Sequence, residues 1–380
     1  LNLARRVKDK WKDRSHLAEL NLKAGRQARA ASAFEQALEY FTIGLELLGD
    51  AAWKRHYPLV LSLHEEATEM SSLCGRFELM EKQAGAVKDN ARDDLDLANV
   101  YLCLIQAYTI HGELKKAMET GEEILEKLGC KLSPLSPDQW QQTLVQIKPS
   151  LVGKSAEEVM RFEPLTQPLS KVLVHILYEL HLPYSEAGVT LDDGLWQPIT
   201  SKRISFLLNH FHPDYSPEFY SLLGYIYCVF THDFAFGYEL GRLGIQLMEA
   251  LDRKEINCRV SGGFNSSIRF FREPLSATLD PLLEAHKMGI ETGDFFYAGR
   301  SAVIRCQIAF MCGKELNWLK GELSTLKLAL KKIDYIIGSP HAEMLMKTIT
   351  ILMEEPATLS TGIMDQYHRV TVAEYLYDEQ

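Results

Sequence analysis

The chain has 380 residues, of which 46% are hydrophobic and 24% charged, proportions typical of a folded protein rather than a disordered one. Its formal net charge is −10 and its basic residues are scattered, which argues against nucleic acid or an anionic membrane as a partner. We see no signal peptide and no apolar run long enough for a membrane span. The seven cysteines form no CxxC pair and several lie in apolar helical stretches, which predicts a reducing, cytoplasmic setting.

Helical periodicity in the first third of the chain repeats at intervals of about 37 to 43 residues. Residues 98–129 show the unit most clearly, with apolar residues at helical spacing on both sides of a turn, and residues 16–49 and 58–91 resemble it. The turns are expected at Ser32, Gly75 and Gly112. The spacing is that of tetratricopeptide repeats, helical hairpins that bury their apolar stripes only by stacking on neighbours. We therefore predict regular tetratricopeptide-like repeats over residues 1–130.

Prolines interrupt this rhythm after Cys130, so we predict an irregular helical connection over residues 131–200. The segment 183–198 is rich in glycine, aspartate and proline and is expected to be irregular. Helices are expected at 137–147, 155–162 and 168–181.

Degenerate helical repeats are predicted over residues 201–353, followed by a tail at 354–380. A helix at 199–211 leads to a hairpin at 217–251 that turns at Asp233-Phe234, and a second hairpin occupies 279–311. Further helices are expected at 316–332 and 342–353.

The second helix of the hairpin at 217–251 contains Gly237, Gly241 and Gly244. Each glycine costs roughly 1 kcal/mol of helix propensity relative to alanine. We interpret the three as a face where another helix comes close. No strand-period run is long enough to build a sheet. The predicted fold is all-α, a superhelical stack of tetratricopeptide-like helical hairpins, or α-solenoid.

One short motif resembles a nucleotide-binding loop. Gly153-Lys154-Ser155 is similar to the end of a phosphate-binding P-loop, but Lys148 stands where that motif requires a glycine. We therefore interpret Ser155 as the cap of a helix.

The histidines do not form a recognisable metal motif. His175 and His181 are poorly spaced for one helix face, and His210 and His212 stand at a helix end before a proline. No serine or cysteine has the neighbours of a nucleophile. We predict no catalytic residue, no metal and no cofactor, and hence that this chain by itself is not an enzyme, although its parent protein could be an ATPase or kinase.

The first helices of the three regular hairpins form one candidate recognition surface. Stacked hairpins create a concave face that suits a protein or peptide segment, although solvated helix surface is the ordinary alternative. The candidate residues are Glu19, Arg26, Arg29, Glu65, Glu69, Asn99 and Gln106.

A dense aromatic block lies between Phe211 and Tyr238 and forms a second candidate. Such residues belong either to the core or to a ligand pocket, and the sequence leaves both open. The candidate pocket residues are Phe219, Tyr220, Tyr227, Phe234, Tyr238 and Arg272.

Several segments together resemble a known family. These are Ala18–Gly25, Ser216–Leu247, Arg272–Leu275 and Glu291–Asp294, and the likeness covers most of residues 1–300. They are similar to the tetratricopeptide-like helical region of large signalling proteins that join a STAND-type ATPase, a GAF sensor and a histidine kinase or serine/threonine kinase. The resemblance implies a position after the ATPase and before the sensor and kinase, and a regulatory role.

Two functional hypotheses follow. The first is a non-catalytic helical-repeat module that binds a protein segment, such as an adjacent ATPase or kinase domain of the same chain, and regulates it in signal transduction. The alternative is a small-molecule sensor with an aromatic-lined pocket near residues 211–272. The first predicts an exposed polar surface, and the second predicts a cavity lined by tyrosine and phenylalanine.

Overall fold

A computed structural model describes residues 14–49, 51–187, 196–332 and 339–354. Most of the predicted tail at 354–380 and part of the predicted irregular segment at 183–198 lie outside these residues. The described chain forms 18 α-helices, mostly packed as sequential pairs, which confirms the all-α hairpin stack. None of these helices is long and apolar enough to cross a membrane.

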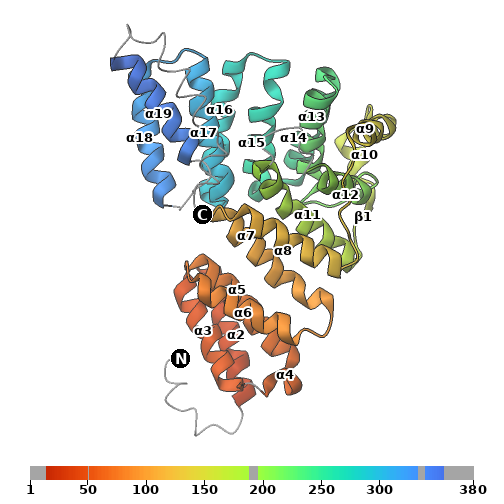
Figure 1. Cartoon of the computed structure of the whole chain (residues 1–380), viewed down its shortest axis with the longest axis vertical. Coiled ribbons are helices and arrows are strands. Elements are labelled where there is room, and N and C mark those ends of the chain that lie inside the picture. Colours follow the sequence, from red (N-terminus) through yellow and green to blue (C-terminus); the bar gives the residue numbers. More distant parts are fainter. Residues whose placement is uncertain (1–13, 50, 188–195, 333–338, 355–380) are drawn as a thin grey trace. The chain divides into compact units, whose positions relative to one another are not determined.

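Contacts divide the chain into two compact units, of which the first comprises residues 1–109 and 113–132, and the second residues 110–112 and 133–380. The helices of the first part of the chain (Figure 1) are α2 (Arg14–Ala30), α3 (Phe34–Leu48), α4 (Ala52–Arg55), α5 (Tyr57–Leu73), α6 (Phe77–Asn90), the 3₁₀ helix η1 (Asp94–Leu97), α7 (Ala98–Ile110) and α8 (Leu114–Lys127).

The first unit repeats one helical hairpin. α2 packs on α3 and α5 on α6, while α3 also contacts α5, so successive hairpins share a core. The predicted turn residues Ser32, Gly75 and Gly112 have positive φ angles of 58°, 67° and 77°, which reverse the chain between paired helices. The shared core contains the buried side chains of Ala18, Ala37, Leu38, Phe41, Leu63, Ala67 and Met70.

The second unit contains the remaining helices and one two-residue strand pair. Its α-helices are α9 (Pro137–Leu151), α10 (Ala156–Met160), α11 (Pro168–Ala187), α12 (Gln197–Leu207), α13 (Ser216–Phe230), α14 (Phe234–Leu251), α15 (Asn257–Ser267), α16 (Leu279–Thr292), α17 (Phe295–Met311), α18 (Leu316–Lys332) and α19 (Ser339–Glu354). The 3₁₀ helices are η2 (Lys254–Ile256), η3 (Arg269–Phe271) and η4 (Leu275–Thr278), and the strands are β1 (Glu163–Pro164) and β2 (His210–Phe211).

Helix boundaries in the second unit correct three predictions. α11 continues through Pro183 to Ala187, so residues 183–187 are helical rather than irregular. Pro183 and Tyr184 are buried, and this packing outweighs the hydrogen bond that a proline removes. The helix predicted at 199–211 ends at Leu207, because β2 leaves the helix to pair in parallel with β1. α15 was not predicted at all.

The three helical glycines of α14 lie where neighbouring helices come close to it, as predicted. A Cβ on Gly237 would lie 2.6 Å from the carbonyl oxygen of Gly224, and one on Gly244 would lie 2.5 Å from that of Pro217. Gly241 instead faces α15, where its Cβ would meet the ring of Phe264 at 2.7 Å. These glycines thus let α14 approach two helices at close range.

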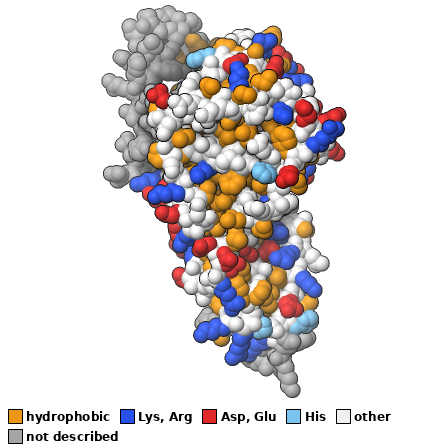
Figure 2. Space-filling model, turned by 90° about the vertical axis from the view of Figure 1, so that its right-hand side faces the viewer, with side chains coloured by type: hydrophobic (Ala, Val, Ile, Leu, Met, Phe, Trp, Pro, Cys, Tyr) orange, Lys and Arg blue, Asp and Glu red, His pale blue; other side chains and the backbone are white. Residues whose placement is uncertain are grey.

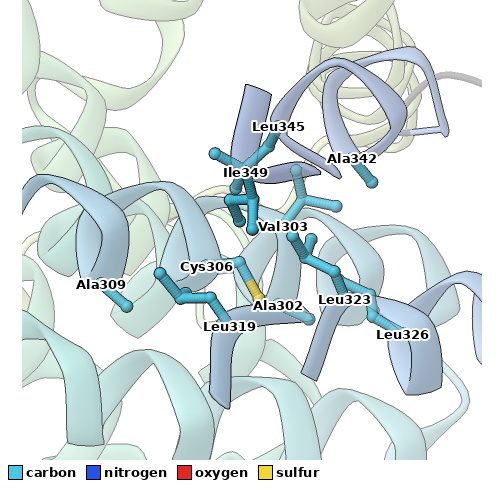
Figure 3. Close-up of a cluster of buried hydrophobic side chains, with 10 residues drawn as sticks. All are labelled: Ala302, Val303, Cys306, Ala309, Leu319, Leu323, Leu326, Ala342, Leu345 and Ile349. Atoms are coloured by element: carbon cyan, nitrogen blue, oxygen red, sulfur yellow. The ribbon is translucent and has the colours of Figure 1, made fainter. Parts of the chain in front are cut away.

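The last three described helices, α17, α18 and α19, pack against one another through a shared apolar cluster (Figure 3). Side chains from all three helices point into it, with Cys306 of α17 beside the leucines of α18. Cys306 is free, as are the other six cysteines, all of which lie in described residues. Its burial raises the pKa of the thiol to about 11, which makes it a small apolar core residue rather than a nucleophile.

Candidate recognition sites

The predicted surface on the first helices of the hairpins is a network of ion pairs. Arg26 Nε on α2 donates to Glu66 Oε1 on α5 at 2.6 Å. Arg29 Nη1 lies 2.9 Å from Glu66 Oε2 and 2.8 Å from Glu69 Oε2. Of the seven predicted residues, Arg26 and Arg29 therefore meet at the carboxylate of Glu66, and Glu69 joins them through Arg29. We call this group the first-helix surface, together with the other predicted residues of α2, α5 and α7.

A second link within this surface joins α5 to α7. Asn99 Nδ2 donates to Glu65 Oε1 at 2.8 Å. Burial raises the pKa of the Glu65 carboxyl group, and the hydrogen bond from Asn99 opposes that effect. Glu19 and Gln106 are exposed on α2 and α7, and Glu19 Oε2 lies 3.7 Å from His16 Nδ1. The surface is thus polar and largely exposed, and neighbouring hairpins are tied together across it.

Glu66 is the residue of this surface that sequence analysis missed. Only 9% of its side chain is exposed, against 51% for Arg26, so it forms the buried centre of the pairing. Its role depends on how α2 packs against α5, which helical periodicity within one hairpin does not show. Leu73, one helical turn after Glu69, adds a side chain that is 54% exposed.

The six predicted pocket residues lie in different surroundings. Phe219, Tyr220 and Tyr227 are buried in the core at 0–1% exposure, and the hydroxyl group of Tyr227 donates to the Leu144 carbonyl oxygen at 2.6 Å. Phe234 is 37% exposed and stacks on Phe271 with ring centroids 4.7 Å apart. Thus three of these aromatic residues support the α13–α14 core.

Tyr238 and Arg272 lie nearer the surface. The hydroxyl group of Tyr238 donates to Glu273 Oε1 at 2.5 Å, and Glu273 also receives hydrogen bonds from Arg269. These hydrogen bonds from Arg269 and Tyr238 lower the pKa of the Glu273 carboxyl group. Arg272 is exposed.

An open cavity of about 390 Å³ lies between the end of α9 and one face of α14. Of the six predicted residues, Tyr238 lines it. Charged side chains at its wall come from Lys154, Glu239 and Arg242. Its size suits a small ligand, and its lining is more polar than the aromatic pocket that the sequence suggested.

The P-loop-like segment at one wall of this cavity is a helix start. The hydroxyl group of Ser155 accepts from the Glu158 amide at 3.2 Å, and Glu158 Oε2 accepts from the Ser155 amide at 2.9 Å. This capping box confirms the interpretation of Ser155 as a helix cap.

Charge and metal-ligating groups are dispersed over the described residues. On the face shown in Figure 2, basic and acidic side chains are interspersed rather than separated into patches of one sign. No group of three or more histidine, cysteine, aspartate or glutamate side chains within the described ranges is arranged to hold a metal ion.

No protein-family model matches the chain. Among known proteins it is similar to hybrid signal transduction histidine kinase G of Dictyostelium discoideum, with 21% identity over 316 aligned residues. The match covers 74% of this chain but only 9% of the relative's length. The chain is therefore a helical region distantly related to part of a histidine kinase signalling protein, in agreement with the histidine-kinase part of the resemblance.

Proposed function

We propose that this chain is a non-catalytic, cytoplasmic helical-repeat module that binds a protein segment and thereby regulates an attached ATPase or kinase in signal transduction. The bound segment belongs to an adjacent domain of the same polypeptide or to a partner. The observation that carries the proposal is the first-helix surface, where polar side chains link α2 to α5 and α5 to α7.

The first-helix surface suits protein binding for two physical reasons. The ion pairs between hairpins hold its side chains in place before a partner arrives, which lowers the entropic cost of binding. The exposed apolar side chain of Leu73 beside charged neighbours supplies the mixture of apolar and polar contacts typical of interfaces. The distant similarity to a histidine kinase supports a role in signalling.

The test uses the polypeptide that contains this chain together with its ATPase or kinase region. Gln106 is exposed on α7 and is changed to tryptophan, which obstructs the surface without removing an ion pair. Lys115→Trp on α8, at a side chain that is 87% exposed, is the matched control on the second helix of the same hairpin. We expect Gln106→Trp to raise basal ATP turnover or phosphotransfer several-fold, and Lys115→Trp to leave it unchanged.

Equal activity of both variants and the unmodified protein would contradict regulation through this surface. The non-catalytic part of the proposal is tested separately on the purified 380-residue chain. ATP hydrolysis by that chain, retained after further purification, would disprove it.

A second candidate function is small-molecule sensing, which the cavity beside Tyr238 favours. A ligand in this cavity would stabilise the chain against unfolding in proportion to the logarithm of its concentration. The change Gln246→Trp, at an exposed residue of the cavity wall, should fill the space and remove that stabilisation. A ligand that stabilises this variant as much as the unmodified chain binds elsewhere.

A further inference from the structure

A fully buried guanidinium lies within the second unit, on helix α12. Arg203 of α12 is 0% exposed, and its Nη2 donates to a carboxylate oxygen of Glu218 on α13. Its Nε and Nη1 have no hydrogen-bond partner among the described residues. Arginine carries five N–H donors, and burying them without acceptors costs free energy. Arg203 thus retains hydrogen-bonding capacity that its protein neighbours do not use.

A second unpaired polar atom belongs to α11, the helix whose Tyr178 ring centroid lies 5.3 Å from Arg203 Cζ. His181 of α11 has a buried Nδ1 without a hydrogen-bond partner in the described part of the chain. Burial, together with the positive charges of Arg203 and Arg300, lowers the pKa of His181 to about 3. His181 is therefore neutral near pH 7 and lies near two arginines.

Arg259 of α15 completes the cationic group. The Cζ atoms of Arg203 and Arg259 lie 5.3 Å and 5.2 Å from the centroid of the same Tyr178 ring. This ring fixes both guanidinium groups through cation–π contacts. Arg259 Nε also pairs with Asp294 Oδ2 at 2.5 Å, and its side chain is 28% exposed. The cluster therefore reaches from the fully buried Arg203 towards solvent at Arg259.

The unused atoms of this cluster define the chemistry of a ligand. Glu218 and Asp294 each engage one arginine but leave Arg203 Nε, Arg203 Nη1 and His181 Nδ1 open. Charge-assisted hydrogen bonds, such as those from a guanidinium to an oxyanion, are about twice as strong as hydrogen bonds between neutral groups. The planar fork of arginine also matches two oxygens of one phosphate or carboxylate group.

We propose that Arg203 and His181, with Arg259 and Arg300 beside them, form a binding site for a small oxyanion, namely a phosphate or carboxylate group. The ligand accepts from Arg203 Nε and Nη1 and from His181 Nδ1 in the tautomer that carries the proton there. This site is separate from the cavity beside Tyr238 and does not depend on the proposed protein-binding role.

The test measures binding of inorganic phosphate and of acetate to the purified 380-residue chain by calorimetry and thermal unfolding, with chloride keeping the ionic strength constant. We expect saturable binding of at least one of the two anions, which also shows whether phosphate or carboxylate is preferred. Arg203→Gln should weaken that binding at least ten-fold.

The matched control is Arg305→Gln on α17. Arg305 is also largely buried, pairs with Glu322 at 2.8 Å and has an unpartnered Nε, but it lies over Trp318 rather than Tyr178. This variant should keep the anion affinity. Absence of saturable binding of both anions, or equal affinities of the Arg203→Gln variant and the unmodified chain, would overturn the proposal.

Glu218→Gln provides a second test that does not depend on the folding of the Arg203 variant. Removing the negative charge that pairs with Arg203 Nη2 should strengthen anion binding several-fold, because that charge repels an anion at Nε and Nη1, whereas a purely structural ion pair predicts no such gain. Unchanged or weaker binding by the Glu218→Gln variant would also overturn the proposal.

Discussion

Gly224 of α13 and Gly237 of α14 bring two helix backbones into direct contact. A Cβ on Gly224 would lie 2.5 Å from the Gly237 carbonyl oxygen, and a Cβ on Gly237 would lie 2.6 Å from that of Gly224. Real Cβ atoms do not approach other atoms so closely, and backbone is an obstacle on each side; a Cβ on Gly237 would also lie 2.5 Å from Cys228 Sγ. Neither position can accept alanine unless the helices move apart.

We predict that Gly237→Ala lowers the free energy of unfolding of the second unit by up to about 2 kcal/mol. Overpacking costs about 1–3 kcal/mol, and the gain of about 1 kcal/mol in helix propensity offsets part of this cost. Chemical denaturation followed by circular dichroism measures it. Gly321→Ala is the control, because no atom lies within 4 Å of its added Cβ and α18 should gain stability. Two stabilised variants would show that α13 and α14 are not in close contact.

The close approach of α14 to its neighbours could be predicted. Glycines within an apolar helical pattern lower helix propensity, and a closely packed neighbouring helix compensates for that cost. The existence of α15 could not be predicted, because its sequence, Asn257–Ser267, contains two glycines, three serines and two asparagines, and lacks apolar periodicity. Its helix forms through tertiary contacts: Val260 and Phe264 are buried, and α15 packs against α13, α14, α16 and α17.

Asp233 joins two roles at the turn between α13 and α14. Its Oδ1 accepts from the Phe236 amide at 3.2 Å and caps α14, while its Oδ2 receives Lys148 Nζ from α9 at 2.5 Å. The hydrogen bond from Lys148 is the main reason that the pKa of the Asp233 carboxyl group is lowered. The Lys148 and Asp233 side chains are 42% and 30% exposed, so solvent screens the ion pair.

We predict that Asp233→Asn, which keeps the cap, costs less than about 1 kcal/mol of unfolding free energy. Asp233→Ala should cost about 1 kcal/mol more, because the cap is also lost. Lys148→Met separates the ion pair from the cap. It removes the ion pair and keeps the cap, so its loss of unfolding free energy should match that of Asp233→Asn. Thermal unfolding of the three variants checks the order. Equal losses for the asparagine and alanine variants would exclude a capping contribution.

Ser32 occupies a turn position where the next two hairpins have glycine. Its φ angle is 58°, beside 67° at Gly75, and a side chain with a Cβ is strained there by about 1 kcal/mol. We predict that Ser32→Gly raises the free energy of unfolding of the first unit by up to that amount. The reverse change, Gly75→Ser, should lower the free energy of unfolding through backbone strain. No atom lies within 4 Å of the added Cβ, so steric clash does not contribute to this loss. Urea denaturation compares the two, and changes of the same sign would contradict this reasoning.

The candidate sites were only partly accessible to sequence analysis. Arg26, Arg29 and Glu69 could be selected because hairpin spacing places them on first helices, but their shared partner Glu66 depends on how two hairpins pack. Arg203 could not be identified as a site residue from the sequence, because no motif surrounds it and its burial arises from the packing of α12. Phe219 and Tyr227 belong to the same aromatic block as Tyr238, and only packing distinguishes core from cavity wall.

Acid should destabilise the second unit through His181. Its pKa in the folded chain is lowered to about 3, mainly by burial, while the unfolded chain keeps a value near 6.5. Below pH 6.5 the unfolded state therefore binds a proton that the folded state does not, and stability that is present above pH 6.5 is lost as the pH falls. The expected loss is about 0.7 kcal/mol per pH unit at pH 6.5 and approaches about 1.4 kcal/mol per pH unit near pH 5.

The change His181→Asn removes the titrating group and keeps a polar atom near the position of Nδ1. We predict that the unfolding free energy of this variant falls less steeply than that of the unmodified chain, with a difference that approaches about 1.4 kcal/mol per pH unit near pH 5. Urea denaturation from pH 7.5 to 5.0 in buffers without phosphate or acetate measures both profiles. His64 and His212, whose pKa values burial also lowers, are present in both chains and cancel in the comparison. Parallel profiles would mean that His181 titrates alike in the folded and unfolded chains, because only a group with the same pKa in both states leaves the slope unchanged.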